Sequence, residues 1–139
     1  MLDLSTKDIL NLTFSVCEKP VLAPFGGAVV VADPSLLTPD QTPDGTWRMF
    51  FHTTFGVYQF RSADGVHFRR VQKVASRAMR PNVNRVGDLY YLFYERTRPL
   101  LVNALNLANL AKWRSHLCVR TSPDLIHWSA PRQIGRAHV

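Results

Sequence analysis

The chain has 139 residues, of which 46% are hydrophobic and 19% charged, a balance typical of a globular domain with its own core and not of a disordered chain. No apolar run approaches the roughly 20 residues of a membrane-spanning helix, and Cys17 and Cys118 have no zinc-type spacing, so the sequence predicts no membrane, metal or cofactor partner. The net charge of +7 comes from scattered basic residues without a nucleic-acid-binding motif, which argues against a nucleic-acid partner.

The two ends of the chain are expected to lie outside the main domain. Residues 1–19 form an N-terminal extension that lacks the basic start and apolar block of a secretion signal, which favours a cytoplasmic location over export. Residues 134–139 resemble one reading frame of a common sequencing adapter, so they are expected to be a technical addition. The expected domain therefore spans residues 20–133 and is a fragment of a longer protein.

Short strands and turns dominate the first half of this domain. A β-branched apolar run at residues 28–31 leads into Asp33, and a loop rich in Pro, Asp and Thr follows. Strands are then predicted over residues 47–53, 56–62 and 68–74, with Ser62-Ala63-Asp64-Gly65 as a tight turn before the last of them. Regularly spaced short strands of this kind predict an all-β sandwich, barrel or propeller.

An internal repeat favours the propeller. Three features of the first half return in the same order in the second half: 33–35 as 82–84, 49–52 as 92–95, and 62–68 as 122–128. A four-stranded unit repeated in tandem is typical of propeller blades. The sequence thus predicts about two four-stranded blades, at residues 28–76 and 77–133.

A longer connection interrupts the second blade between Thr97 and Ser115. Its residues 103–113 are good helix formers and predict a short helical insertion. The insertion either walls a pocket or covers an exposed edge, and its Trp113 is the candidate exposed platform for stacking on a sugar ring.

Specific motifs in these blades resemble the five-bladed β-propeller glycoside hydrolases of family 43 and their relatives. The similarity covers residues 20–133 and rests on Ala32-Asp33-Pro34-Ser35-Leu36-Leu37, on the strand Gly87-Asp88-Leu89-Tyr90-Tyr91-Leu92-Phe93-Tyr94, and on the two Ser-x-Asp blade endings. The resemblance implies a five-bladed propeller that hydrolyses glycosidic bonds in oligo- or polysaccharides.

Asp33 is the candidate catalytic residue. In the family, the aspartate that opens the inner strand of the first blade is the base or nucleophile, and this role falls on Asp33 by resemblance. Glycoside hydrolysis usually needs two carboxyl groups, one ionised and one protonated. A simple Asx-type turn before Pro34 is the structural alternative.

Two features depart from the family pattern. The second-blade position that is usually another aspartate is occupied by Asn82, which carries no charge but could bind a sugar hydroxyl. The family's acid glutamate resembles a third-blade residue, which is expected downstream of this chain.

Further candidate substrate contacts surround Asp33. Glu95 ends the second strand of its blade, where the hairpin returns it to the face of Arg80, so the two form either a pocket wall or a cross-strand ion pair. An arginine so close would favour the ionised carboxylate, the wrong state for a general acid. His52 occupies the equivalent place on the first blade, as a structural residue or a contact to a sugar hydroxyl.

The sequence therefore predicts a glycoside hydrolase fragment that binds a carbohydrate substrate and needs no cofactor. A non-catalytic carbohydrate-binding propeller is the first alternative, and a glycoside phosphorylase that uses phosphate in place of water is the second. The sequence leaves the sugar, the linkage and the oligomeric state open.

Overall fold

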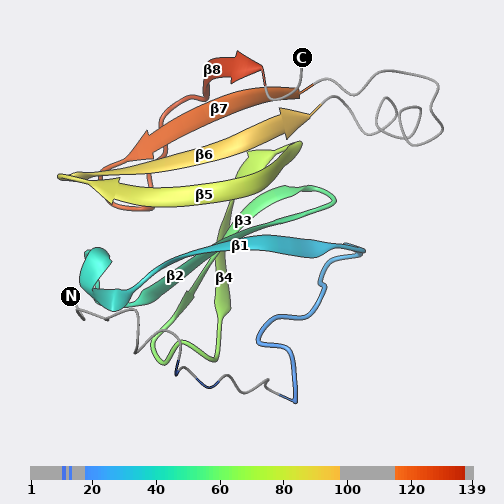
Figure 1. Cartoon of the computed structure of the whole chain (residues 1–139), viewed down its shortest axis with the longest axis vertical. Coiled ribbons are helices and arrows are strands. Elements are labelled where there is room, and N and C mark those ends of the chain that lie inside the picture. Colours follow the sequence, from blue (N-terminus) through green and yellow to red (C-terminus); the bar gives the residue numbers. More distant parts are fainter. Residues whose placement is uncertain (1–10, 12, 14–17, 98–114, 137–139) are drawn as a thin grey trace.

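Two four-stranded antiparallel sheets make up the part of the chain that the computed structural model describes, namely residues 11, 13, 18–97 and 115–136 (Figure 1). The first sheet contains β1 (Val31–Leu37), β2 (Trp47–Thr53), β3 (Gly56–Ser62) and β4 (Arg69–Ser76). The second contains β5 (Ala78–Val86), β6 (Leu89–Thr97), β7 (Ser115–Ser122) and β8 (Arg132–Arg136). A single 3-10 turn, η1 (Pro39–Gln41), is the one helical element of the described residues.

The order of the strands in each sheet follows the chain, as in a propeller blade. The predicted all-β fold of two tandem four-stranded units, consistent with a partial propeller, is thereby confirmed. The predicted strands over 47–53 and 56–62 coincide with β2 and β3. The predicted helical insertion falls in residues 98–114, outside the described residues. β8 includes Ile134, Gly135 and Arg136, so the stretch expected to be a technical addition continues the outermost strand.

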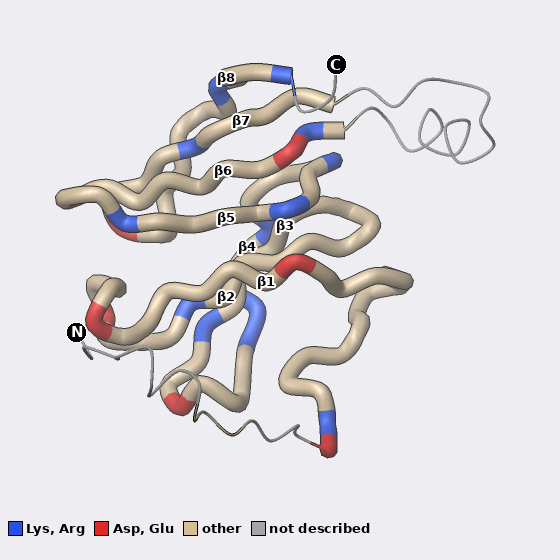
Figure 2. The backbone as a smooth tube through the Cα atoms, in the orientation of Figure 1, with Lys and Arg blue, Asp and Glu red and all other residues tan. Residues whose placement is uncertain are grey.

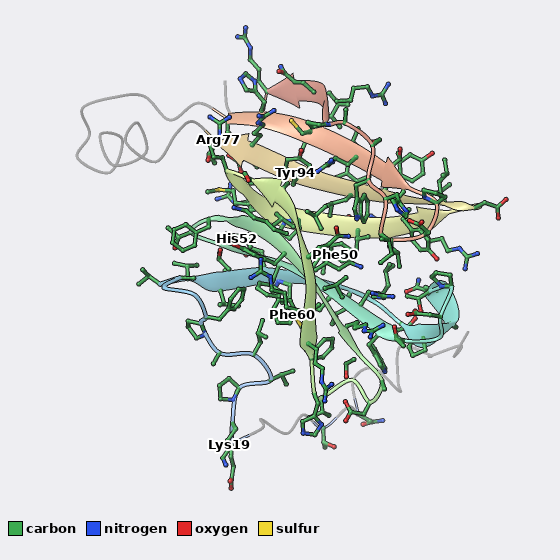
Figure 3. All side chains as sticks on the ribbon, turned by 180° about the vertical axis from the view of Figure 1, so that it is seen from behind. Lys19, Phe50, His52, Phe60, Arg77 and Tyr94 are labelled. Carbon is green, nitrogen blue, oxygen red and sulfur yellow. The ribbon has the colours of Figure 1, made fainter. Side chains whose placement is uncertain are left out.

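The first blade packs on the second through one face of β2. Because side chains alternate along a strand, Phe50 and His52 share one face while Met49 and Phe51 share the other. Phe50 is completely buried and meets the Trp128 ring edge-on, with the centroids 5.8 Å apart. Figure 3 shows Phe50 between the two sheets.

The core between the blades is a single apolar cluster drawn from both sheets. It consists of buried side chains of Leu37, Phe50, Val57, Val74 and Ala75 from the first blade, and of Ala78, Val83, Tyr90, Leu92, Tyr94, Cys118 and Leu125 from the second. Full burial of one large apolar side chain stabilises the fold by about 1.5–3 kcal/mol. This cluster therefore fixes how the starts of the inner strands β1 and β5 face each other.

A second cluster covers the opposite face of the first blade. Met49, Phe51, Tyr58 and Phe60 are buried there, with Phe25 from the segment before β1 packed against them. The Phe25 ring meets Tyr58 edge-on at a centroid distance of 5.2 Å. The segment before β1 thus covers the face that points away from the second blade.

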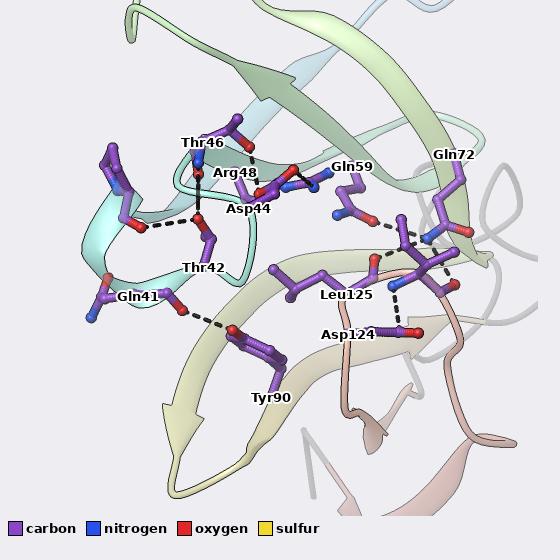
Figure 4. Close-up of polar contacts among 12 residues, drawn as sticks. Gln41, Thr42, Asp44, Thr46, Arg48, Gln59, Gln72, Tyr90, Asp124 and Leu125 are labelled. Carbon is purple, nitrogen blue, oxygen red and sulfur yellow. Dashed lines mark hydrogen bonds and ion pairs between the residues drawn. The ribbon is translucent and has the colours of Figure 1, made fainter.

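Polar contacts tie the two blades together near the apolar core (Figure 4). The Tyr90 hydroxyl donates to the carbonyl of Gln41 at 2.9 Å. The Gln72 side-chain amide donates to the carbonyls of Leu125 and Ile126, at 3.3 and 3.1 Å. These bonds satisfy backbone carbonyls where the blades meet. Because hydrogen bonds are directional, they restrict the relative orientation of the two blades in a way that apolar contacts do not.

The turn after the third strand of each blade is built in the same way. In the first blade Ser62 Oγ donates to Asp64 at 2.7 Å, and Asp64 accepts the backbone N–H groups of Val66 and His67. His67 Nδ1 lies 2.7 Å from the same carboxylate. The hydrogen bonds from the His67 side chain and backbone, and from Ser62, hold the pKa of Asp64 well below its usual range. Asp124 makes the matching contacts in the second blade.

No helix within the described ranges is long and apolar enough to cross a membrane.

Candidate functional site

Asp33 lies in an irregular stretch of β1. The register of β1 against β2 shifts between Ala32 and Ser35, so Asp33 and Pro34 form a bulge. Asp33 has a φ of 54°, in the left-handed region that aspartate tolerates better than most residues. Its side chain is 49% exposed. A strained bulge beside a half-exposed carboxylate is the kind of feature that clusters at functional sites.

The structural counterpart of Asp33 in the second blade is Arg80. Between Met79 and Asn82 the register of β5 against β6 shifts in the same way, and Arg80 has a φ of 52°. Asn82 lies opposite Phe93 as Ser35 lies opposite Phe50, so Asn82 corresponds to Ser35. The expectation that Asn82 occupies the position of Asp33 is therefore wrong by two residues.

The sequence contained a signal for the correct alignment. A proline follows the strained residue in both blades, as Pro34 and Pro81. Proline suits a bulge because it has no N–H to contribute to the ladder. The similar side chains of Asp33 and Asn82 suggest that these two residues correspond, while the backbone geometry is repeated at the residue before each proline.

Asn82 corresponds to a residue of the first sheet, Ser35, that makes a hydrogen bond between the blades. The Ser35 hydroxyl accepts the Val83 N–H at 3.0 Å, across the contact between the sheets. Asn82, its counterpart, is exposed on the face of the second sheet that points away from the first, and its side-chain oxygen accepts a hydrogen bond from the Asn84 amide. This placement favours a structural role over contact with a substrate at Asp33.

His52 lies between Asp33 and the second blade. It lies on β2, opposite Ala32 of β1. Its side chain is 14% exposed, and its Nδ1 lies 3.4 Å from Asp33 Oδ2. The Arg80 backbone N–H donates to the same nitrogen, also at 3.4 Å. Burial lowers the pKa of His52 despite the opposing charge of Asp33, so the neutral imidazole that accepts the Arg80 N–H is favoured.

Glu95 and Arg80 form the cross-strand ion pair that the sequence allowed. Arg80 Nη1 lies 2.6 Å from Glu95 Oε2, with the arginine side chain 59% exposed and the glutamate side chain 5% exposed. The guanidinium beside this buried carboxylate favours its ionised form, the opposite of what a general acid needs. It anchors Arg80 at the edge of the site.

These residues form one cluster at the junction of the inner strands of the two blades. Asp33, Arg80 and Glu95 all act electrostatically on His52, which places the four side chains around a common centre. Trp113, the remaining predicted contact, lies outside the described residues. Within the described ranges no group of three or more His, Cys, Asp or Glu residues could hold a metal ion.

The chemistry available to this cluster is that of one accessible carboxylate held by its surroundings. Asp33 can accept a proton or attack an electrophilic carbon, and His52 lies on one side of it. Asp33 is the one carboxyl group of the cluster not engaged by an arginine. A two-carboxylate mechanism would need a second carboxyl group beyond those four residues.

Comparison with solved structures identifies a propeller enzyme with a similar fold. The chain is similar to a GH43 endo-arabinanase from Bacillus licheniformis, with a TM-score of 0.56 and 14% sequence identity. The match covers 76% of this chain and 38% of the arabinanase, so the chain spans well under half the length of that enzyme. No protein-family model matches the sequence, and no curated protein matches it either. The likeness supports the propeller fold.

Proposed function

We propose that this chain is part of a carbohydrate-active propeller enzyme that hydrolyses glycosidic bonds, with Asp33 as the base or nucleophile. The supporting observation is that Asp33, half-exposed and 3.4 Å from His52, lies at a strained bulge where the inner strands of two blades meet. In a propeller the inner strands surround one central funnel, so carboxylates from further blades converge on the same space. The similarity in fold to an arabinanase makes an arabinan the first substrate to test.

The proposed role of each residue follows from its exposure and from its ion pairs. Asp33 is exposed to solvent and acts in its ionised form, either by activating water or by attacking the sugar carbon directly. Arg80 and Glu95, as an ion pair, form part of the wall of the proposed substrate site. The acid that protonates the leaving group is a carboxyl group from outside this chain, as expected from the resemblance to family 43.

The variant Asp33→Asn tests this role with little disturbance of the backbone. Asparagine tolerates the left-handed conformation at least as well as aspartate, so the bulge should persist. In the complete protein, release of reducing sugar from arabinan should fall by about 10²-fold or more, the usual contribution of a catalytic acid or base. Binding of arabinan oligosaccharides, measured by isothermal titration calorimetry, should change little.

A matched control for this variant is Asp88→Asn. Asp88 is exposed in the β5–β6 turn, far along the strands from the bulge, and loses a carboxylate in the same way. Its activity should equal that of the parent protein. If Asp33→Asn also retained full activity, Asp33 would have no place in the mechanism.

A carbohydrate-binding propeller without catalysis remains the second candidate. It is favoured by the Arg80–Glu95 pair, because this pair places an arginine where the first blade has its free aspartate. Under this alternative the complete protein binds oligosaccharides and cleaves none. A phosphorylase would instead release sugar phosphate, and only when inorganic phosphate is supplied.

A further inference from the structure

A basic hollow lies at one end of the second sheet, apart from the Asp33 cluster. Its volume is about 280 Å³, and it is lined by Arg77, Arg96, Thr97, His116, Cys118, Pro131 and Gln133. Three of these residues are basic and none is acidic. The hollow lies where β5 begins, β6 ends and β7 begins; Figure 3 labels Arg77 there.

The sheet register and one backbone contact hold the basic groups together. Arg96 on β6 and His116 on β7 are directly opposite each other, on the same face as the buried Cys118. Arg77 is held against the end of β6, because its carbonyl accepts the Thr97 N–H at 2.8 Å and the Thr97 hydroxyl at 3.3 Å. Two charged basic residues opposite each other on neighbouring strands repel, and an anion bound between them would relieve this repulsion.

No acidic side chain among the described residues offsets this charge. The side chains of Arg77, Arg96 and His116 make no ion pair or hydrogen bond within the described ranges. Glu95 precedes Arg96, but alternation places it on the opposite face, where it pairs with Arg80. The connecting sequence 98–114 also contains three basic residues and no acidic one. Figure 2 shows the sparse acidic residues of this sheet.

We propose that this hollow binds a single oxyanion group, such as a phosphate, a sulfate or a sugar carboxylate. Two guanidinium groups can donate paired hydrogen bonds to the oxygens of one anion, and the His116 ring can donate a third contact. Gln133 supplies an uncharged polar side chain to the lining. Burial raises the pKa of the Cys118 thiol, so the floor of the hollow carries no competing negative charge.

The site does not depend on the proposed hydrolase activity. It uses residues of β6, β7 and β8 and of the connections before β5 and β8, whereas the Asp33 cluster lies on β1, β2 and β5 and shares only β6, through Glu95. Arg136 lies opposite His116 on β8 but is not among the residues that line the hollow. Loss of anion binding and loss of activity can therefore be told apart by separate variants.

Binding of simple anions to the full chain tests the site. Inorganic phosphate, sulfate and galacturonate are titrated separately by isothermal titration calorimetry, at an ionic strength held constant with sodium chloride. Saturable binding of phosphate or sulfate indicates a site for a free oxyanion or its ester, whereas binding of galacturonate alone indicates the carboxylate of an acidic sugar. Absence of saturable binding for all three overturns the proposal.

Substitutions separate a built site from the general positive charge of the chain. Arg96→Gln should weaken binding by about tenfold or more, because it removes a charge-assisted hydrogen bond. Arg96→Lys keeps the charge but loses the planar fork, so it should bind less tightly than the parent chain and more tightly than Arg96→Gln. The control is Arg132→Gln, which removes an exposed arginine from β8 opposite Val119, outside the hollow.

The control also defines the result that contradicts the site. Equal losses in Arg96→Gln and Arg132→Gln would mean that the anion responds to net charge alone, and the proposal would then fail. A thermal unfolding curve for each variant without anion identifies any that has lost its fold. If Arg96→Gln does not fold, His116→Gln replaces it, with the same expected loss, because His116 is exposed and its replacement disturbs no buried contact.

Discussion

At the scale of single residues, the candidate site depends on backbone strain as much as on charge. Asp33 and Arg80 share the left-handed conformation and the bulge, yet one residue presents a half-exposed carboxylate beside His52 and the other a guanidinium bound to Glu95. The same backbone device therefore serves two different side chains. His52 is buried between them and contacts both blades. Its Nδ1 lies 3.4 Å from Asp33 Oδ2 and 3.4 Å from the Arg80 backbone nitrogen, whose N–H it accepts.

The His52 environment makes stability depend on pH in a defined direction. Because burial lowers the pKa of His52 below its value of 6.5 in an open environment, the folded state favours the neutral ring. The stabilisation is fully present above about pH 6.5, the pKa of an unfolded histidine, and it is lost as pH falls from there through the lower pKa of the folded state.

The variant His52→Gln checks this dependence. The free energy of unfolding, measured by urea denaturation, should fall less steeply below pH 6.5 in the variant than in the parent chain. Between pH 7 and 8.5 the difference between the two proteins should stay constant. A difference that is also constant down to pH 5.5 would contradict the assigned environment.

At the scale of elements, the repeated turn after the third strand is used in two ways. Gly65 and Leu125 both follow the turn aspartate, and both have a positive φ, of 76° and 66°. A Cβ at Gly65 would lie 3.2 Å from the Trp47 ring, so a side chain there would require this ring to shift. In the second blade Leu125 adopts the unfavourable left-handed backbone conformation, and its side chain is fully buried in the core between the blades.

Leu125→Ala should therefore destabilise the fold more than the same substitution at its exposed neighbour Ile126 does. Loss of a fully buried leucine side chain is expected to lower the free energy of unfolding by about 2–5 kcal/mol. Ile126→Ala is the control, because Ile126 is exposed, and its effect should stay within about 0.5 kcal/mol. Equal midpoints of urea denaturation for the two variants would show that Leu125 does not join the blades.

At the scale of the whole molecule, the two sheets leave one apolar face uncovered. On the side of the second sheet that points away from the first, Tyr91 and Phe93 stack with their centroids 6.4 Å apart, and Leu117 is exposed. These positions correspond to the β2 face that buries Phe50 in the first blade. A face of this kind, with an unpaired outer strand beside it, favours association with other apolar surfaces.

The isolated chain should therefore bind a hydrophobic dye and associate at higher concentration. Size-exclusion chromatography with light scattering, together with fluorescence of a naphthalenesulfonate dye, measures both effects. Phe93→Ser should reduce dye binding, because it removes half of the stacked pair. A parent chain that remains monomeric, melts cooperatively and binds no dye would contradict the prediction.

The sequence alone determined the architecture, because strand periodicity and turn chemistry are local. Alternating residues in β2 and β3 and the two Ser-x-Asp turns identified the strands and the repeat without any knowledge of tertiary contacts. The Arg80–Glu95 pair was also predictable, since a hairpin places its two ends side by side.

Only the tertiary structure decided which residues correspond between the blades and which of them meet. A bulge shifts the register without changing the pattern of residue types, so the sequence shows the equivalence of Asp33 with Arg80 only through the proline that follows each of them. The grouping of Arg77, Arg96 and His116 was hidden for a related reason, because it depends on strand register and on a contact at the end of β6. The number of residues between two positions in the chain predicts neither the correspondence between the blades nor this grouping.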